Sequence, residues 1–204
     1  MRPALVALVL AAAAAPGPAA DVALGLPALQ PPPAAQVALG RQLFFDRRLS
    51  ANGTLSCAMC HVPEQGFTVN EARTSVGMNG VSLRRNAPTL LNVAFVERLF
   101  HDGRAASLEE QALQPLVHPD EMANASIAAV IARVNAMSDY RRPLRAAFGS
   151  GRATPMRLAR ALAAYQRTLI AAGSPFDRWF YGGDAAALDA LAPRGFAIFR
   201  EPGC

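Results

Sequence analysis

The chain has 204 residues, of which 52% are hydrophobic and 17% are charged, enough for one ordinary domain with a hydrophobic core and part of a second domain. All 20 basic residues are arginines, and the formal net charge is +5. Because these arginines are scattered along the chain rather than clustered, the charge pattern argues against a nucleic-acid-binding protein.

The first twenty residues have the pattern of a secretory signal peptide. Arg2 gives a positive start, residues 4–15 form a continuous apolar run, and small residues follow. The run is too short to span a bilayer, so we expect residues 1–20 to be cleaved near Ala19 or Ala20. An uncleaved N-terminal anchor is the alternative. No later stretch is long and apolar enough to span a membrane, so the mature protein is expected to be soluble and outside the cytoplasm.

After a proline-rich lead-in at residues 21–35, helical periodicity indicates a mainly α protein. Residues 36–46 are predicted to form a short helix. From residue 47 to 104 the helical period fades and Gly, Asn, Pro and Ser recur, which is typical of long loops with short helical turns. A loop region of this length is usually functional or wrapped around something. Further helices are predicted by the Ser107–Glu110 capping box, opening a helix through Leu113, by the apolar spacing from Ile127 to Val134, by the Thr154-Pro155 start signal, and by Asp184 as the cap of a helix over residues 188–199.

The cysteines carry the clearest chemical signal. An exported protein with three cysteines needs an explanation beyond paired disulfides. Cys57-Ala58-Met59-Cys60-His61 fits the attachment pattern of a c-type haem. Two thiols three positions apart can form thioethers with the two vinyl groups of one porphyrin, and His61 then lies under the iron as its axial ligand. The alternatives are a zinc site, which needs a fourth ligand at suitable spacing, a thioredoxin-like redox pair and a plain disulfide.

This motif is one of several sequence blocks that follow one another after the leader. The blocks are LGRQLFFDRRLSANGTLSCAMCH (39–61), RNAPTLLN (85–92), FHDGRAASLEEQAL (100–113), HPDEM (118–122), AYQRTL (164–169) and SPFDRW (174–179). Together they resemble the di-haem cytochrome c peroxidase family, which includes the MauG-like enzymes. The resemblance implies two cytochrome c-like domains, each with one haem: an N-terminal, peroxide-reacting domain at residues 36–171 and the start of a second domain at residues 172–204.

The resemblance also implies two distal residues over the peroxide-reacting iron. By motif position these are Gln111 and Glu121. A carboxylate near the iron can take a proton from bound hydrogen peroxide and return it to the leaving oxygen. For Glu121, a solvated acidic loop is the alternative.

Other positions depart from the family pattern or match it only in part. Many members have a His after TSxG that ligates the resting iron, where this chain has Met78. Met can ligate haem iron, but a non-ligating loop residue is as compatible, and our hypothesis is a five-coordinate haem that needs no reductive activation. Many members have a Trp before DGR, where this chain has Phe100 and His101, so the electron path between the haems stays open. Asn86 matches a position that helps to hold calcium between the domains, or it is a turn residue.

The last cysteine has a counterpart in a weak internal echo. GRQLFF at residues 40–45 precedes Cys57, and GFAIF at residues 195–199 precedes Cys204. Given the family pattern, Cys204 is expected to be the first cysteine of a second CxxCH motif, and the sequence is expected to be truncated there.

The expected function of the intact protein is that of a periplasmic peroxidase. It would reduce hydrogen peroxide to water with electrons from a small c-type cytochrome or a cupredoxin. The alternatives are a MauG-like oxidase and, in a different class, a single-haem electron carrier. A carrier would fill both axial positions and lack a distal acid, so Gln111 and Glu121 argue against it. Homodimers are common in the family.

Overall fold

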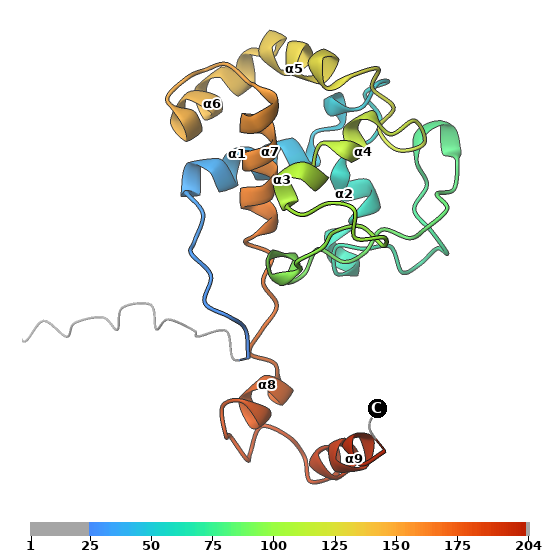
Figure 1. Cartoon of the computed structure of the whole chain (residues 1–204), viewed down its shortest axis with the longest axis vertical. Coiled ribbons are helices and arrows are strands. Elements are labelled where there is room, and N and C mark those ends of the chain that lie inside the picture. Colours follow the sequence, from blue (N-terminus) through green and yellow to red (C-terminus); the bar gives the residue numbers. More distant parts are fainter. Residues whose placement is uncertain (1–24, 203–204) are drawn as a thin grey trace, which may run out of the picture. The chain divides into compact units, whose positions relative to one another are not determined.

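The computed structural model describes residues 25–202 (Figure 1). The predicted signal peptide and Cys204 lie outside the described residues. Within residues 25–202 the chain forms helices and loops, with three isolated β-bridges and no strand, which confirms the prediction of a mainly α protein. None of these helices is long and apolar enough to cross a membrane. One compact unit comprises Leu29–Ala171, and a second contains the residues from Ala172 onward.

The first unit is a helical domain with a long loop region between its second and third helices (Figure 1). Its α-helices are α1 (Ala34–Phe45), α2 (Cys57–Cys60), α3 (Leu108–Gln111), α4 (Gln114–Val117), α5 (Ile127–Ala136), α6 (Arg141–Phe148) and α7 (Pro155–Gln166). Short 3₁₀ turns lie at Arg47–Leu49, Pro63–Gln65, Met78–Gly80, Val93–Phe95 and Ser138–Tyr140.

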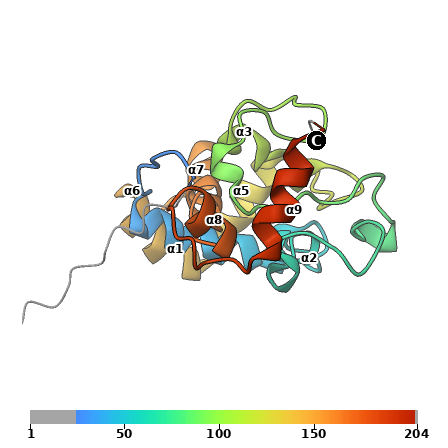
Figure 2. The ribbon, with the colours of Figure 1, turned by 90° about the horizontal axis from the view of Figure 1, so that it is seen from below.

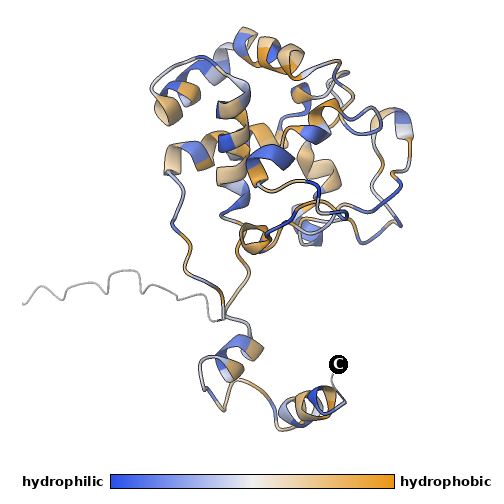
Figure 3. Ribbon diagram, viewed as in Figure 1, coloured by the Kyte–Doolittle hydropathy of each residue, from blue (hydrophilic) through white to orange (hydrophobic). Residues whose placement is uncertain are grey.

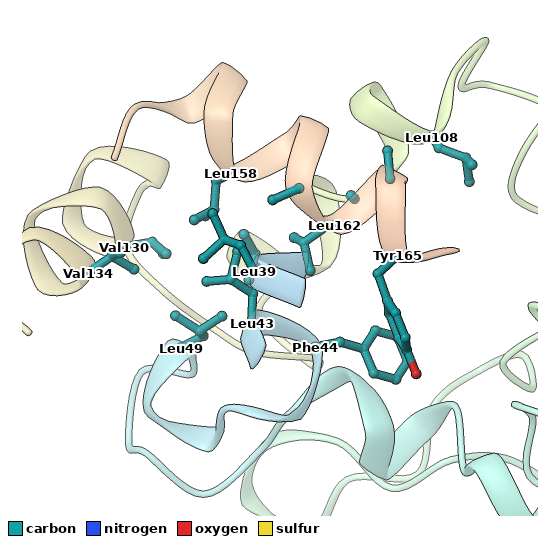
Figure 4. Packing of buried hydrophobic residues seen from close by; sticks show 14 of the residues in the cluster. Leu39, Leu43, Phe44, Leu49, Leu108, Val130, Val134, Leu158, Leu162 and Tyr165 are labelled. Carbon is teal, nitrogen blue, oxygen red and sulfur yellow. The ribbon is translucent and has the colours of Figure 1, made fainter. Parts of the chain in front are cut away.

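Helices α1 and α7 pack closely and form the centre of this domain. Their close approach depends on Gly40, because a Cβ atom at this position would lie 1.8 Å from the carbonyl oxygen of Ala161. The Phe44 ring packs at 5.2 Å from the Tyr165 ring. Burial of large apolar side chains is the main favourable contribution to folding. The fully buried side chains around this crossing include Leu39, Leu43, Leu49, Val130, Val134, Leu158 and Leu162 (Figure 4).

Most of the predicted helices form, and their starts follow the capping signals. The hydroxyl of Thr154 accepts a hydrogen bond from the Arg157 amide at 3.2 Å at the start of α7. The predicted helix after Ser107 is shorter than expected, because α3 ends at Gln111 and α4 starts at Gln114. Pro115 explains the interruption, since proline has no N–H to continue the helical hydrogen bonds.

A buried tyrosine fixes the start of α6 against the end of α1. The hydroxyl of the fully buried Tyr140 donates a hydrogen bond to Asp46 at 2.6 Å. Asp46 also accepts hydrogen bonds from the guanidinium of Arg48, the shortest at 2.6 Å. Arg48 in turn reaches Asp139 at 2.7 Å. This charged group therefore ties α1, the Arg47–Leu49 turn and the entry to α6 together.

The second unit contains α8 (Pro175–Phe180) and α9 (Leu191–Arg200), drawn as separate helices in Figure 2. Ser174 and Asp177 form a complete capping box for α8. The expected cap at Asp184 is wrong: the carboxylate of Asp189 accepts hydrogen bonds from the first two amides of α9, at 2.8 and 3.0 Å. The Asp184 carboxylate instead accepts from the amide of Ala186, within a turn.

Helix α9 carries both hydrophobic and hydrophilic residues (Figure 3). Several of its hydrophobic side chains are exposed within the described residues, namely Leu191 at 72%, Ile198 at 68% and Phe199 at 55%. Phe196 instead packs against the aromatic rings of α8.

Candidate haem-binding site

The two cysteines of the haem motif lie on the single turn of α2. The amide of His61 donates a hydrogen bond to the carbonyl of Cys57 at 2.8 Å and closes this turn. Residues three positions apart on a helical turn share one face. Both cysteines are half-buried, and neither forms a disulfide with another described residue. The two thiols are therefore presented side by side at the edge of the core.

Both thiols are held in their neutral form. Burial raises the pKa of Cys57 to about 12, and burial also raises the pKa of Cys60. The negative charge of Glu121 raises the pKa of both thiols further. A thioredoxin-like pair requires a lowered thiol pKa, which disagrees with this environment. Among residues 25–202 no group of three His, Cys, Asp or Glu side chains could hold a metal ion, so the zinc alternative gains no support.

The imidazole of His61 is held in one tautomer by backbone carbonyls. Its Nδ1 lies 3.1 Å from the carbonyl oxygen of Phe67 and 3.1 Å from that of Pro88. Carbonyl oxygens only accept hydrogen bonds, so Nδ1 carries the proton and Nε2 keeps its lone pair. Burial lowers the pKa of His61, and the ring is therefore neutral near pH 7. A neutral imidazole with an unprotonated Nε2 is a metal ligand.

The turn that places the Phe67 carbonyl has an unusual backbone. Phe67 has φ of 58°, a left-handed conformation that is uncommon for a residue with a bulky side chain. Its amide donates to the carbonyl of Val62 at 2.8 Å, and Val62 pairs with Thr68. The Phe67 ring packs against the Phe44 ring at 6.2 Å. Core packing therefore maintains the turn that orients His61.

A second loop supplies the Pro88 carbonyl and is tied to the first loop by side chains. The hydroxyl of Thr68 donates to the carbonyl of Ala87, and the hydroxyl of Thr89 donates to the carbonyl of Gly66. The amide group of Asn86 donates to the carbonyl of Val69 at 2.6 Å. These cross-links hold residues 66–69 and 86–89 together behind the His61 ring.

The loop that carries Glu121 is fixed from beneath by a buried asparagine. The side chain of Asn124 is 4% exposed. Its amide group donates to the carbonyls of Leu49 and Leu116, at 2.8 and 2.7 Å. Its oxygen accepts from the guanidinium of Arg133 at 2.8 Å. Asn124 thus joins the Glu121 loop to the Arg47–Leu49 turn, to α4 and to α5.

The carboxyl group of Glu121 is half-buried, and its pKa is raised. Burial raises its pKa, while the positive charges of His118 and Arg104 partly offset this effect. The Nδ1 atom of His118 lies 3.9 Å from a carboxylate oxygen of Glu121. A carboxyl group with a raised pKa can both accept and return a proton closer to neutral pH than an exposed glutamate can.

The loop that contains Met78 rests directly on the Glu121 loop. The amide of Met78 donates to the carbonyl of Asp120 at 2.9 Å. A Cβ atom at Gly77 would lie 1.9 Å from the same oxygen, so only glycine fits there. The neighbouring Ser75 hydroxyl donates to the carbonyl of Cys60 at 3.4 Å. The Met78, Glu121 and Cys60 segments therefore lie next to one another.

Comparison with known proteins explains this arrangement. The profile of a family described as di-haem cytochrome c peroxidase matches residues 34–186. The chain belongs to this family. The methylamine utilization protein MauG of Methylophilus methylotrophus is 42% identical over 163 residues, which are 79% of this chain and 48% of that protein. The cytochrome c551 peroxidase of Nitrosomonas europaea is 40% identical over 166 residues, which are 81% of this chain and 48% of that protein.

Solved structures of di-haem peroxidases have the same fold. A dihaem peroxidase from Burkholderia thailandensis superposes with a TM-score of 0.73 at 35% identity, covering 86% of this chain and 48% of that one. A MauG-like protein associated with microbial copper homeostasis has a TM-score of 0.72 at 33% identity, covering 86% of this chain and 54% of that one. The chain spans about half the length of these relatives.

Membership of the di-haem peroxidase family implies haem c, and the residues present fit that group. The two neutral thiols of α2 are available for thioether formation, and the His61 ring offers Nε2 while its Nδ1 is occupied. Half-exposed apolar side chains accompany the thiols: Met59 lies between them, and Val76 follows Ser75, whose hydroxyl reaches the Cys60 carbonyl.

The remaining predicted site residues differ in burial and in their contacts. Gln111 ends α3 and is half-buried, and no hydrogen bond among the described residues joins its side chain to Glu121. Phe100 is half-buried under the Arg104 guanidinium, which lies 3.4 Å from the ring centre. His101 is exposed, and its Nε2 lies 3.1 Å from the Asn86 carbonyl. The Asn86 side-chain oxygen is buried and has no hydrogen-bond partner among the described residues.

Sequence reasoning missed the residues that position the site. The Phe67 and Pro88 carbonyls have no residue signature, because any residue supplies a carbonyl. Asn124 lies two residues after the end of the HPDEM block, and only its burial within the fold reveals its role. Pro88 lies inside the RNAPTLLN block, which indicated importance but no function.

Proposed function

We propose that the intact protein is a periplasmic peroxidase that reduces hydrogen peroxide to water with electrons from a small c-type cytochrome or a cupredoxin. The reaction consumes one hydrogen peroxide, two electrons and two protons and forms two waters. The observation that carries the proposal is the half-buried carboxyl group of Glu121, which lies on a loop that contacts the Met78 loop, which in turn reaches Cys60 of CxxCH. Export by the predicted signal peptide at residues 1–20 would deliver the chain to the periplasm.

In this proposal Cys57 and Cys60 would hold the haem through their thiols, and Nε2 of His61 would bind its iron. The haem would supply the redox-active iron of the reaction. The Phe67 and Pro88 carbonyls keep the proton on Nδ1 and so prevent His61 from rotating away. Their partial negative charge also makes the imidazole a better electron donor.

Glu121 moves the proton. It accepts the proton from the peroxide oxygen that stays and gives it to the oxygen that leaves as water, so its net charge is restored. The raised pKa suits this exchange, because a general acid–base group is most effective when its pKa is near the working pH. Nδ1 of His118 lies 3.9 Å from a carboxylate oxygen of Glu121. Gln111 is proposed to direct its amide to the same oxygens.

Met78 and Asn86 have more limited proposed roles. We propose that the haem iron is five-coordinate. If the iron had a sixth ligand from the protein, Met78 would be that ligand. The unpartnered oxygen of Asn86 supports a calcium role, because calcium takes amide and backbone carbonyl oxygens. Addition of a chelator to the intact protein should lower its thermal stability if calcium is bound there. Phe100 and His101 are proposed to lie on the electron path.

A MauG-like oxidase is the second candidate. The observation that favours it is the identity to two MauG proteins, 42% and 46%, compared with 37–40% for several cytochrome c peroxidases. Such an enzyme would use the same haem and Glu121 to oxidise a protein or a small molecule, and would turn over peroxide slowly with a reduced cytochrome.

Residues 172–204 are proposed to begin a second cytochrome c-like domain, with Cys204 attaching a second haem. The exposed apolar side chains of α9 support this assignment, because a complete haem domain would bury them. The intact protein is also proposed to form a homodimer, as others of the family do.

The test is expression of the intact protein with the haem-maturation machinery, followed by peroxide turnover with reduced cytochrome c. The Glu121→Gln variant should lose about 10²- to 10⁴-fold in turnover with an unchanged Soret spectrum. Absence of turnover by a wild-type protein with two haems would reject the peroxidase and favour the oxidase. Full activity of Glu121→Gln would reject the proton-transfer role alone.

A further inference from the structure

The connection between α6 and α7 encloses a pocket lined by arginines. Arg141 and Arg145 lie one turn apart on α6, and Arg152 lies in the loop that leads to α7. With Asn135 and residues 149–151 they line a cavity of about 650 Å³. Helix α6 lies away from α2, on the other side of the domain (Figure 1), so this pocket is separate from the haem-binding site.

The loop that forms the pocket is held in place. The side chain of Asn135 donates to the carbonyl of Ala153 at 3.3 Å and accepts from the Ala153 amide at 2.8 Å. Gly151 lies so close to α6 that a Cβ atom would be 2.8 Å from Cγ of Arg141 and 3.0 Å from its carbonyl oxygen. These contacts hold the loop of the pocket against α5 and α6.

The positive charge in this pocket is not balanced by neighbouring acids. Among residues 25–202, none of the ion pairs includes Arg141, Arg145 or Arg152, and all three side chains are exposed. Arg48 and Arg167, by contrast, each bind a carboxylate. The sequence from residue 140 to 176 contains no Asp or Glu at all.

The pocket also offers neutral donors, and no hydrophobic side chain lines it. Within the described part of the chain, the amides of Ser150, Gly151 and Arg152 donate no hydrogen bond. The lining contains only Arg, Asn, Ser and Gly residues, which excludes a hydrophobic ligand. Three guanidinium forks and free amides are the donors that carboxylates and phosphates bind.

We propose that this pocket binds a small anion with two or more oxyanionic groups, of the polyphosphate or polycarboxylate class. The volume lies in the range of small-molecule sites, roughly 300–1,000 Å³. A single monovalent anion would leave most of the charge of the three guanidinium groups unmatched. Two linked anionic groups can pair with Arg145 on α6 and with Arg152 across the pocket at the same time.

The test is calorimetric titration of the haem-loaded protein with pyrophosphate, with citrate and with acetate at constant ionic strength. We expect saturable binding of one pyrophosphate or one citrate per chain and none of acetate; the stronger of the two ligands separates the phosphate from the carboxylate class. Arg145→Gln and Arg152→Gln should each weaken binding about tenfold or more. Arg145→Lys should weaken it less, because it keeps the charge but loses the fork.

Arg160→Gln is the matched control, because Arg160 is an exposed arginine of α7 outside the pocket lining. Unchanged far-UV circular dichroism shows that each variant is folded. Arg141 is left intact, because its side chain packs against Gly151. The proposal is overturned if neither pyrophosphate nor citrate binds saturably, or if Arg160→Gln weakens binding as much as Arg145→Gln does.

Discussion

Replacement of Asn124 by alanine would release the loop that carries Glu121. The side chain makes two short hydrogen bonds to backbone carbonyls, of 2.8 and 2.7 Å, and one to the guanidinium of Arg133. Of the groups left behind, the Leu116 carbonyl keeps the Asn124 backbone amide at 3.1 Å. Arg133 keeps the Ser50 carbonyl at 3.0 Å. Most of the expected loss of stability in Asn124→Ala therefore comes from the lost hydrogen bonds themselves.

The expected loss of stability follows from these three bonds. A neutral intramolecular hydrogen bond contributes about 1 kcal/mol and one to a charged group about 1.5–3 kcal/mol. Because Leu116 and Arg133 keep other partners, we expect a decrease of about 4 kcal/mol in the free energy of unfolding. With a urea dependence of about 2 kcal/mol/M, the unfolding midpoint should fall by about 2 M.

Urea unfolding of the haem-loaded protein measures this midpoint, and peroxide turnover without urea measures the effect on Glu121. Tyr140→Phe is the control, since it removes one buried hydrogen bond, to Asp46, away from the Glu121 loop. It should cost about 1–2 kcal/mol and leave turnover unchanged. Asn124→Ala should lower turnover even when it is fully folded. A smaller loss of stability in Asn124→Ala than in Tyr140→Phe, or wild-type turnover in Asn124→Ala, would refute the reasoning.

Three further predictions concern the core, the proton and the iron. Gly40→Ala should destabilise the protein by about 2 kcal/mol in thermal or urea unfolding. Overpacking against the Ala161 carbonyl costs up to about 3 kcal/mol, and the higher helix propensity of alanine offsets about 1 kcal/mol of this cost. A variant as stable as the wild type, or more stable, would contradict the close crossing of α1 and α7. Peroxide turnover should fall with decreasing pH through a midpoint above 4.5, the ordinary pKa of a glutamate. Burial raises the pKa of Glu121, and protonation removes the carboxylate form that accepts the proton. A midpoint at or below 4.5, or the same midpoint in Glu121→Gln, would contradict this prediction. The oxidised haem should be high-spin in both the wild type and Met78→Ala; a low-spin wild-type spectrum that Met78→Ala converts to high-spin would make Met78 the ligand.

The helices could be predicted where local chemistry decides them. Thr154-Pro155 starts α7 as expected, because an N-cap hydroxyl and a proline in the first turn act within one turn of chain. The helix that starts after Ser107 ends at Gln111, two residues before the predicted Leu113, and the short helix α4 was not predicted. Helix α6 was not predicted, since three of its eight residues are arginines and only Leu144 is buried.

The candidate site could be predicted where side-chain identity carries the chemistry. The spacing of Cys57, Cys60 and His61 and the family match of Glu121 selected segments that lie next to one another in the structure. The tautomer of His61 depends on the carbonyls of Phe67 and Pro88, which come from loops without periodicity. A left-handed Phe67 is set by packing against the core, and no local sequence pattern favours it.

The contact between Gly77 and the Asp120 carbonyl makes two segments mechanically dependent. Because Gly77 and the Met78 amide contact the Asp120 carbonyl directly, a displacement of the Met78 loop would also displace Asp120, the residue before Glu121. An engineered iron ligand at position 78 that moved its loop would therefore also move the Glu121 carboxylate. Under the proposed function, a change of iron ligand at position 78 would therefore also change proton transfer by Glu121.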